Sequence, residues 1–109
     1  MRCIIPNKIR FINELNNVIP KYNTNVESIR YRVFKHVEKK YYEEILEINY
    51  TSGARSTRTC NGNSFIMILE ELTQYLGSGY YLENNRTIEL EQSPEWKELS
   101  LEEIEIEYK

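Results

Sequence analysis

Hydrophobic positions repeat with the period of an α-helix near the start of the chain. In residues 7–19 they share one stripe, made by Ile9, Ile12, Leu15 and Ile19. Asn7 is placed to cap this helix and Pro20 to end it, while Lys8 and Arg10 are expected to face water. The pattern predicts a helix over Asn7–Ile19.

A second helical pattern follows the middle of the chain, over Asn63–Leu76. Its start is marked by Ser64 and its end by Gly77. The apolar stripe of this segment consists of Phe65, Ile68, Leu69, Leu72, Tyr75 and Leu76. Both helices therefore have one side suited to covering a sheet.

Between the two helices the period of the apolar residues falls to two, which is typical of β-strands. A two-residue turn at Lys39-Lys40 gives these pairs on the face expected to be buried: Val33 with Leu46 and Tyr31 with Ile48. The outer face then pairs Phe34 with Ile45, Arg32 with Glu47 and His36 with Glu43. A longer loop with the same register is the alternative, because Lys39-Lys40 is not a dipeptide that such turns prefer.

A third strand, Arg55–Cys60, is expected after the turn at Ser52-Gly53. Its Thr residues favour a strand, and its low apolar content indicates an edge of the sheet. With Thr51 opposite Ala54, Arg58 lies beside Glu47 on the outer face. A one-residue bulge at Gly53 would exchange the two faces of this strand.

The C-terminal third predicts shorter elements. A hairpin is expected from Tyr80–Glu83 and Arg86–Glu91, turning at Asn84-Asn85. Ser93 before a proline predicts the start of a short helix, Pro94–Leu99. Leu101–Lys109 predicts a strand, because apolar residues alternate with Glu, and a helix is the alternative.

These elements predict an α+β fold in a single compact domain over residues 1–109. A three-stranded antiparallel meander, residues 28–60, is expected to carry both long helices on one face. C-terminal strands extend this sheet or form a small separate layer. The expected order is α-β-β-β-α-β-β-(short α)-β.

Charge is distributed unevenly along the chain. Residues 83–109 hold nine of the 17 acidic residues and three bases, whereas residues 1–82 hold 11 bases and eight acids. Such asymmetry indicates contacts rather than catalysis. The basic body and the acidic end can pair with each other within one chain, between two copies as a homodimer, or with a partner.

Other features narrow the function class. No run reaches the ~18 apolar residues of a membrane span, so we expect a cytoplasmic protein without membrane contact. Cys3 and Cys60 are expected to be reduced, and with one histidine they provide too few ligands for a metal site. The sequence predicts no cofactor and no enzymatic activity. A catalytic pair of His36 and Cys60 is the weakest alternative.

The acidic end is the first candidate binding surface. On strands, alternate carboxylates lie ~6.6–6.8 Å apart, which is comparable to the phosphate repeat of a DNA strand. The candidate residues are Glu89, Glu91, Glu103, Glu105 and Glu107. They predict binding to a protein partner with a basic surface. The competing explanation is that these charges keep an edge strand unpaired.

The outer face of the sheet is the second candidate. Basic and aromatic side chains alternate there, as on sheets that bind single-stranded RNA or DNA. The residues are Arg30, Arg32, Phe34 and Arg58. Neutralisation of the arginines by Glu47 is the competing explanation. Nucleic-acid binding is therefore the second hypothesis, behind protein binding.

The order helix–three strands–helix over roughly residues 7–76, followed by an acidic C-terminal part, resembles some small phage-encoded inhibitors of CRISPR nucleases. The resemblance concerns element order and charge, without a shared signature sequence. It implies a compact, non-catalytic protein that binds and modulates or inhibits a host protein. We therefore expect a non-enzymatic binding protein from a phage or mobile element.

Overall fold

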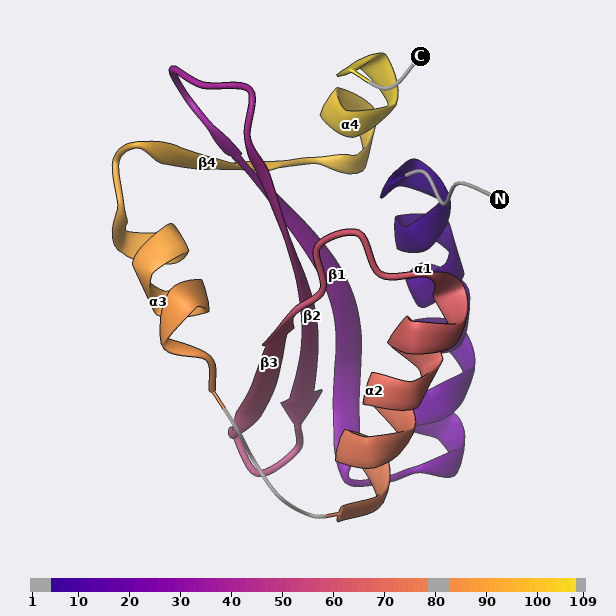
Figure 1. Cartoon of the computed structure of the whole chain (residues 1–109). Coiled ribbons are helices and arrows are strands. Elements are labelled where there is room, and N and C mark those ends of the chain that lie inside the picture. The colour runs from indigo at the N-terminus through magenta and orange to yellow at the C-terminus, as the bar shows by residue number, and fades with distance from the viewer. Residues whose placement is uncertain (1–4, 79–82, 108–109) are drawn as a thin grey trace.

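The computed structural model describes residues 5–78 and 83–107 (Figure 1). Within them the elements are α1 (Ile5–Tyr22), β1 (Val26–His36), β2 (Tyr42–Tyr50), β3 (Arg55–Thr59), α2 (Phe65–Ser78), α3 (Asn85–Gln92), β4 (Trp96–Leu99) and α4 (Leu101–Glu107). The expected α+β class is confirmed, since an antiparallel sheet carries α1 and α2 on one face (Figure 1).

The sheet has the strand order β3-β2-β1-β4. β1 is its longest strand and lies between β2 and β4. β4 pairs antiparallel with the last part of β1, from Val33 opposite Leu99 to His36 opposite Trp96. The C-terminal part therefore extends the meander, as one of the two sequence-based alternatives expected.

The pairing of β1 with β2 keeps the predicted faces but is displaced by two residues. Tyr31 lies opposite Leu46, and Val33 lies opposite Glu44 instead of Leu46. A displacement by an even number leaves every side chain on its predicted face, because side chains alternate with period two. Val33 and Leu46 are accordingly buried in the same core.

A longer loop than predicted accounts for the displacement. The hairpin closes where the His36 amide donates to the Tyr41 carbonyl, 3.1 Å away. Two-residue hairpin turns usually need a positive φ, and no non-glycine residue in the described part of the chain has one. Lys39-Lys40 is therefore part of a wider loop and does not form a tight turn.

The third strand follows the bulge alternative. Gly53 has a φ of 92°, and the Tyr50 amide donates to the Ala54 carbonyl across the turn. Leu46 consequently lies opposite Arg58, one residue from the favoured register. The prediction that Arg58 lies on the outer face is wrong, because its guanidinium pairs with Glu71 of α2 at 3.5 Å.

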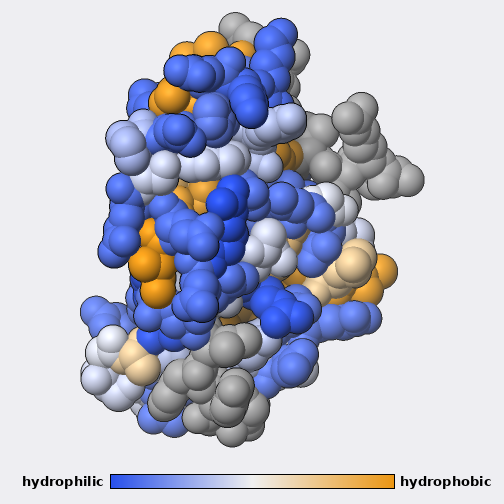
Figure 2. All heavy atoms as spheres, turned by 60° about the vertical axis from the view of Figure 1, so that its left-hand side comes forward, coloured by the Kyte–Doolittle hydropathy of each residue, from blue (hydrophilic) through white to orange (hydrophobic). Residues whose placement is uncertain are grey.

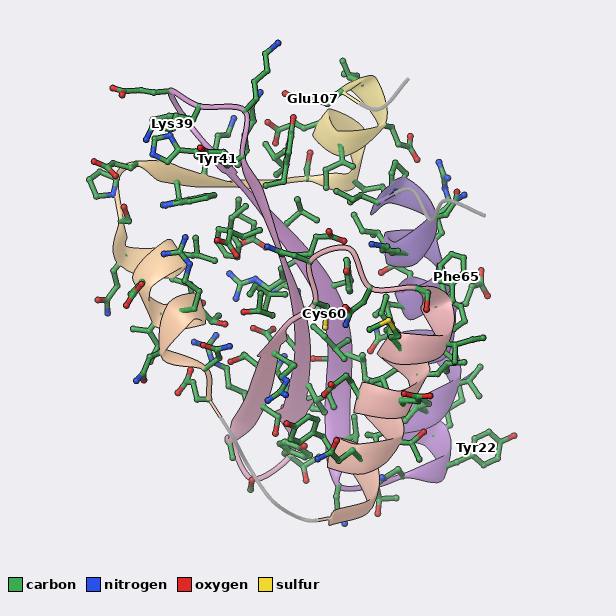
Figure 3. The ribbon with its side chains drawn as sticks, in the orientation of Figure 1. Tyr22, Lys39, Tyr41, Cys60, Phe65 and Glu107 are labelled. Carbon is green, nitrogen blue, oxygen red and sulfur yellow. The ribbon has the colours of Figure 1, made fainter. Side chains whose placement is uncertain are left out.

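The main core lies between the sheet and the two long helices. Ile12 of α1 and Ile68 of α2 are fully buried there, together with Cys60 after β3 (Figure 3). α1 runs past Pro20 to Tyr22, so the prediction that Pro20 ends this helix is wrong, although only two further residues are helical.

Lys8 of α1 is buried, contrary to the prediction that it faces water. Its Nζ lies 2.9 Å from Oε1 of Glu44, and the Tyr31 hydroxyl donates to the same oxygen at 2.7 Å. The Gly62 amide donates to the other oxygen of Glu44. This polar cluster joins α1, the sheet and the loop before α2.

The elements predicted after residue 85 are wrong in type. The first strand of the expected hairpin falls mostly on residues 79–82, outside the described residues, and Arg86–Glu91 lies in α3. The Asn84 side chain caps α3 by accepting from the Arg86 amide. The Ser93 amide donates to the Glu89 carbonyl, so Ser93 ends α3 and does not begin a helix.

α4 replaces the strand predicted for the tail. The Ser100 hydroxyl accepts from the Glu103 amide, and the Glu103 carboxylate accepts from the Ser100 amide. This reciprocal capping box begins the helix. Leu101 and Ile104, three residues apart, pack against the main core, whereas Ile106 is exposed.

Candidate functional site

The outer face of the sheet is covered by a second, smaller core. Phe34 and Ile45 are buried there with Leu90 of α3, and Trp96 of β4 packs against them. α3 lies across this face, and its own outer side is mainly hydrophilic (Figures 1 and 2). Phe34 is 2% exposed, so it presents no ring to a base. The predicted stacking platform is therefore not formed.

Arg32 is at the centre of an ion-pair network beside this core. It donates to Glu47 at 2.9 Å, to Glu91 at 2.8 Å and to both carboxylate oxygens of Glu98. The hydrogen bonds to Glu98 contribute most to raising the pKa of Arg32 above its ordinary value, against the effect of burial. Its guanidinium also lies over the ring of Phe34. Arg32 is thus a structural residue.

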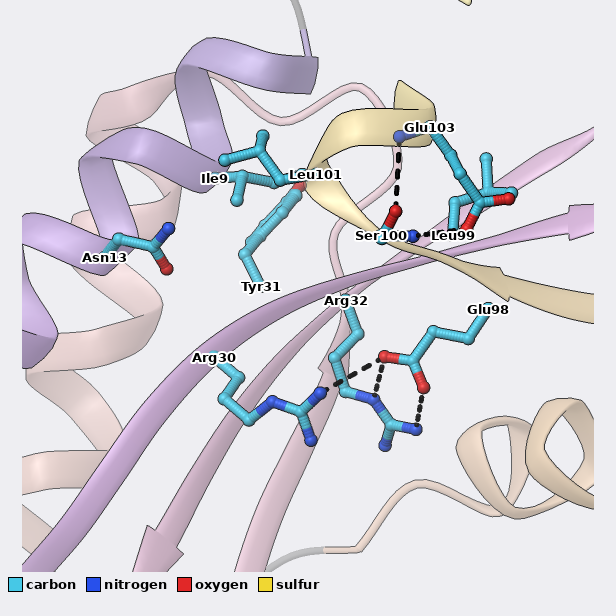
Figure 4. A pocket seen from close by; sticks show the side chains of 10 residues that line it. All are labelled: Ile9, Asn13, Arg30, Tyr31, Arg32, Glu98, Leu99, Ser100, Leu101 and Glu103. Carbon is cyan, nitrogen blue, oxygen red and sulfur yellow. Dashed lines mark hydrogen bonds and ion pairs between the residues drawn. The ribbon is translucent and has the colours of Figure 1, made fainter. Parts of the chain in front are cut away.

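The neighbouring arginines join the same network. Arg55 donates to Glu91 at 2.6 Å and also pairs with Glu83. Arg30, although half exposed, donates to Glu98 at 3.3 Å (Figure 4). Together with Arg58 on the opposite face, these positions do not form the nucleic-acid surface predicted from the sequence.

All five candidate carboxylates of the acidic end pair with bases of the same chain. The partners are Arg86 for Glu89, Arg32 and Arg55 for Glu91, Lys97 for Glu103, Arg10 for Glu105, and Lys35 for Glu107. Because α3 and α4 are helices, the carboxylate row that needs two strands is also absent from these residues. Glu91, Glu105 and Glu107 thus pair the tail with the body within one chain, whereas the partners of Glu89 and Glu103 belong to the acidic end itself.

A pocket of about 470 Å³ opens between α1, β1 and the junction of β4 with α4 (Figure 4). Its charged lining consists of Arg30, Arg32, Glu98 and Glu103. Arg30 and Arg32 bond to Glu98, and Glu103 accepts from Lys97 at 2.9 Å. Since these charges compensate one another, the pocket is a poor site for a charged ligand.

His36 and Cys60 are not brought together. Cys60 lies in the main core, whereas His36 is on the outer face and meets Trp96 edge-on, with ring centroids 5.1 Å apart. Burial raises the pKa of the Cys60 thiol to about 11, which disfavours a nucleophilic thiolate. In the described residues, no three His, Cys, Asp or Glu side chains are grouped to hold a metal ion.

Helix α2 carries apolar residues whose exposure was not predicted from the sequence. Ile66, Met67 and Leu69 of α2 are 69%, 48% and 41% exposed. We call these three residues the apolar strip. The sequence pattern placed Leu69 in the stripe expected to be buried and did not include Ile66 or Met67 in it. The sequence did contain a signal for these exposed residues, namely the unbroken apolar run Phe65–Leu69. Such a run places apolar side chains around the whole helix, and a helix of that kind is usually buried on all sides.

None of the helices in the described ranges is long and apolar enough to cross a membrane. No protein-family model matches the chain, and no curated protein or solved structure matches it either. Function is therefore inferred from the exposed surfaces.

Proposed function

We propose that this chain is a non-enzymatic binding protein that recognises another protein through the apolar strip. The observation that carries the proposal is the exposure of Ile66, Met67 and Leu69 on one helix. Clustered exposed apolar side chains mark interaction sites more often than single ones do. Phe65, next to the strip, packs against Phe11 of α1, with ring centroids 5.1 Å apart. This contact holds the start of α2, which carries the strip, against α1.

Charge near the strip favours a partner with basic residues. Glu70 directly follows the strip and is exposed on α2. A partner that places apolar side chains on the strip and a Lys or Arg beside Glu70 complements both features. Apolar burial then supplies most of the affinity, and salt is expected to weaken binding only slightly.

The proposed role is modulation or inhibition of that partner. It is supported by the element order α1-β1-β2-β3-α2, on which the resemblance to small phage-encoded inhibitors of CRISPR nucleases depends. The acidic residues Glu89, Glu91, Glu103, Glu105 and Glu107 are not part of this binding surface, since their charges are engaged within the chain.

A pair of charge substitutions on α2 tests the proposal. Affinity capture from the native host compares the unmodified protein with Ile66→Glu/Leu69→Glu and with Gln74→Glu, which adds an acid at an exposed position outside the strip. We expect one captured species to be lost with the double variant and kept with Gln74→Glu. A photo-crosslinker at position 66, but not at position 74, should attach to that species.

Two results would contradict the proposal. One is that every captured species survives the double substitution. The other is that the purified protein forms a dimer through Ile66, shown by sedimentation of the unmodified chain and of the double variant. In that case the strip is an interface between two copies.

A further inference from the structure

A second pocket, separate from the apolar strip, lies where the β1–β2 loop meets the starts of α3 and β4. Its volume is about 500 Å³, within the range of small-molecule sites. The lining residues are His36, Lys39, Tyr41, Tyr42, Glu43, Asn61, Arg86 and Trp96. Four of these eight residues carry aromatic rings, and two are cations.

The cations of this pocket are already placed against rings. The Arg86 guanidinium lies 5.1 Å from the centroid of Trp96, and the Lys39 ammonium lies 5.8 Å from the centroid of Tyr41. Arg86 is held in position by Glu43, to which it donates at 2.8 Å. A planar ligand can stack on a guanidinium or on a tyrosine ring at little cost in side-chain ordering.

His36 supplies a hydrogen-bond donor of fixed orientation. Its Nδ1 accepts from the amides of Glu38 and Lys39, both at 3.2 Å, so the hydrogen of the ring is on Nε2. Nε2 lies 3.7 Å from the Glu95 carboxylate, which is too long for a hydrogen bond. The imidazole is nine-tenths buried, and packing against Trp96 fixes the ring.

Two lysines beside the pocket are available to an anion. Lys39 lines the pocket and Lys40 is exposed next to it, and neither forms an ion pair in the part of the chain that the structure describes. The charge of Arg86, in contrast, is compensated by Glu43 and Glu89, so the pocket as a whole is not positive. Flat rings, an ordered donor and the two lysines together fit a ligand with a planar base and a nearby phosphate.

We propose that this pocket binds a nucleotide, with the base against Tyr41 and Arg86 and the phosphate at Lys39 and Lys40. The nucleotide is either free or one unit of a single-stranded nucleic acid, because both present the same base and phosphate. The site uses none of the residues Arg30, Arg32, Phe34 and Arg58, to which sequence patterns assigned nucleic-acid binding, and it does not depend on the apolar strip.

The fluorescence of the single tryptophan reports on this pocket, since Trp96 lines it. The full chain is titrated with AMP, with adenosine, with inorganic phosphate and with a ten-residue single-stranded oligonucleotide. We expect saturable quenching by AMP, and binding about tenfold weaker for adenosine and for phosphate alone. Tighter binding of the oligonucleotide than of AMP assigns the site to single strands, and the reverse order assigns it to free nucleotides.

Matched variants at exposed positions locate the binding. Lys39→Ala/Tyr41→Ala should weaken AMP or oligonucleotide binding about tenfold or more. The control is Lys21→Ala/Tyr22→Ala, an exposed Lys and Tyr at the end of α1, and it should bind as the unmodified protein does. The proposal is overturned if neither nucleotide probe gives saturable quenching, if phosphate binds as tightly as AMP, or if both double variants weaken binding equally.

Discussion

Individual buried charged residues hold α1 against the sheet. Lys8 and Glu44 are 2% and 6% exposed, yet each has its charge compensated by the other. Burial of an unpaired charge is costly, so the two residues depend on each other. Neither their contact nor the burial of Lys8 follows from the helical pattern, because the partners are 36 residues apart.

Glu44→Gln should lower the free energy of unfolding by about 3–5 kcal/mol, because Lys8 would be left buried without a counter-charge. Urea denaturation of the variant gives this value. Glu14→Gln, at an exposed position of α1, is the control and should change stability by less than about 0.5 kcal/mol. Equal midpoints for Glu44→Gln and the unmodified protein would show that the buried pair does not contribute.

Glu91 makes stability depend on pH. Its hydrogen bond from Arg55 contributes most to lowering its pKa to about 2, below the ordinary value of about 4.3. The folded state therefore binds this proton less readily than the unfolded state does. The stabilisation is fully present above about pH 4.3 and is lost as the pH falls towards 2.

The measurement is denaturant unfolding of the unmodified protein and of Glu91→Gln between pH 7 and pH 2. The stability difference between them should be constant above about pH 5 and should shrink at lower pH. Glu102→Gln, exposed at the start of α4, provides the control. A difference that stays constant down to pH 2 would refute the assigned pKa.

At the scale of elements, long periodic segments were predictable and short ones were not. α1, the three-stranded meander and α2 were predicted because each repeats its pattern over several turns or several residue pairs. The segments of α3 and α4 are eight and seven residues long, and in both the apolar residues alternate as in a strand. Tertiary contacts decided their type, with Leu90 buried beside Phe34 and Ile104 in the main core.

A local signal for α4 was nevertheless present in Ser100 and Glu103, which have the spacing of a capping box. Ser100→Ala should destabilise the protein by about 1 kcal/mol, since the Glu103 amide loses its acceptor. Thermal unfolding followed by circular dichroism measures the change. Gln74→Ala, at an exposed position of α2, is a suitable control, and the same shift in both variants would argue against a specific cap.

For the whole molecule, the charge asymmetry of the sequence serves to close the fold. The basic outer face of the sheet and the acidic C-terminal part meet across α3 and β4, through Arg32, Glu91 and Glu98. Sequence patterns identified both groups of residues but assigned them to external partners. Contacts between residues about 60 positions apart leave no local pattern, so this pairing needed the structure.

A chain that ends at residue 82 should lose the second core. Phe34 and Ile45 would be uncovered, and Arg32 would keep only Glu47 among its carboxylate partners. We expect it to bind a dye for exposed apolar surface and to unfold over a broader range of denaturant. A chain ending at Ser100 keeps α3 and β4 and should be less affected. Identical unfolding of the full chain and the 82-residue chain would disprove the dependence.

The late position of α3 and β4 in the chain has a consequence for biosynthesis. A ribosome completes β1 and β2 well before residues 85–99 emerge, so the nascent polypeptide displays Phe34, Ile45 and an Arg32 that lacks Glu91 and Glu98 in the meantime. During that interval the chain offers chaperones a mixed apolar and basic surface that the finished protein conceals. Slow translation of codons 60–85 should therefore lower the yield of native protein more than slow translation of codons 1–25.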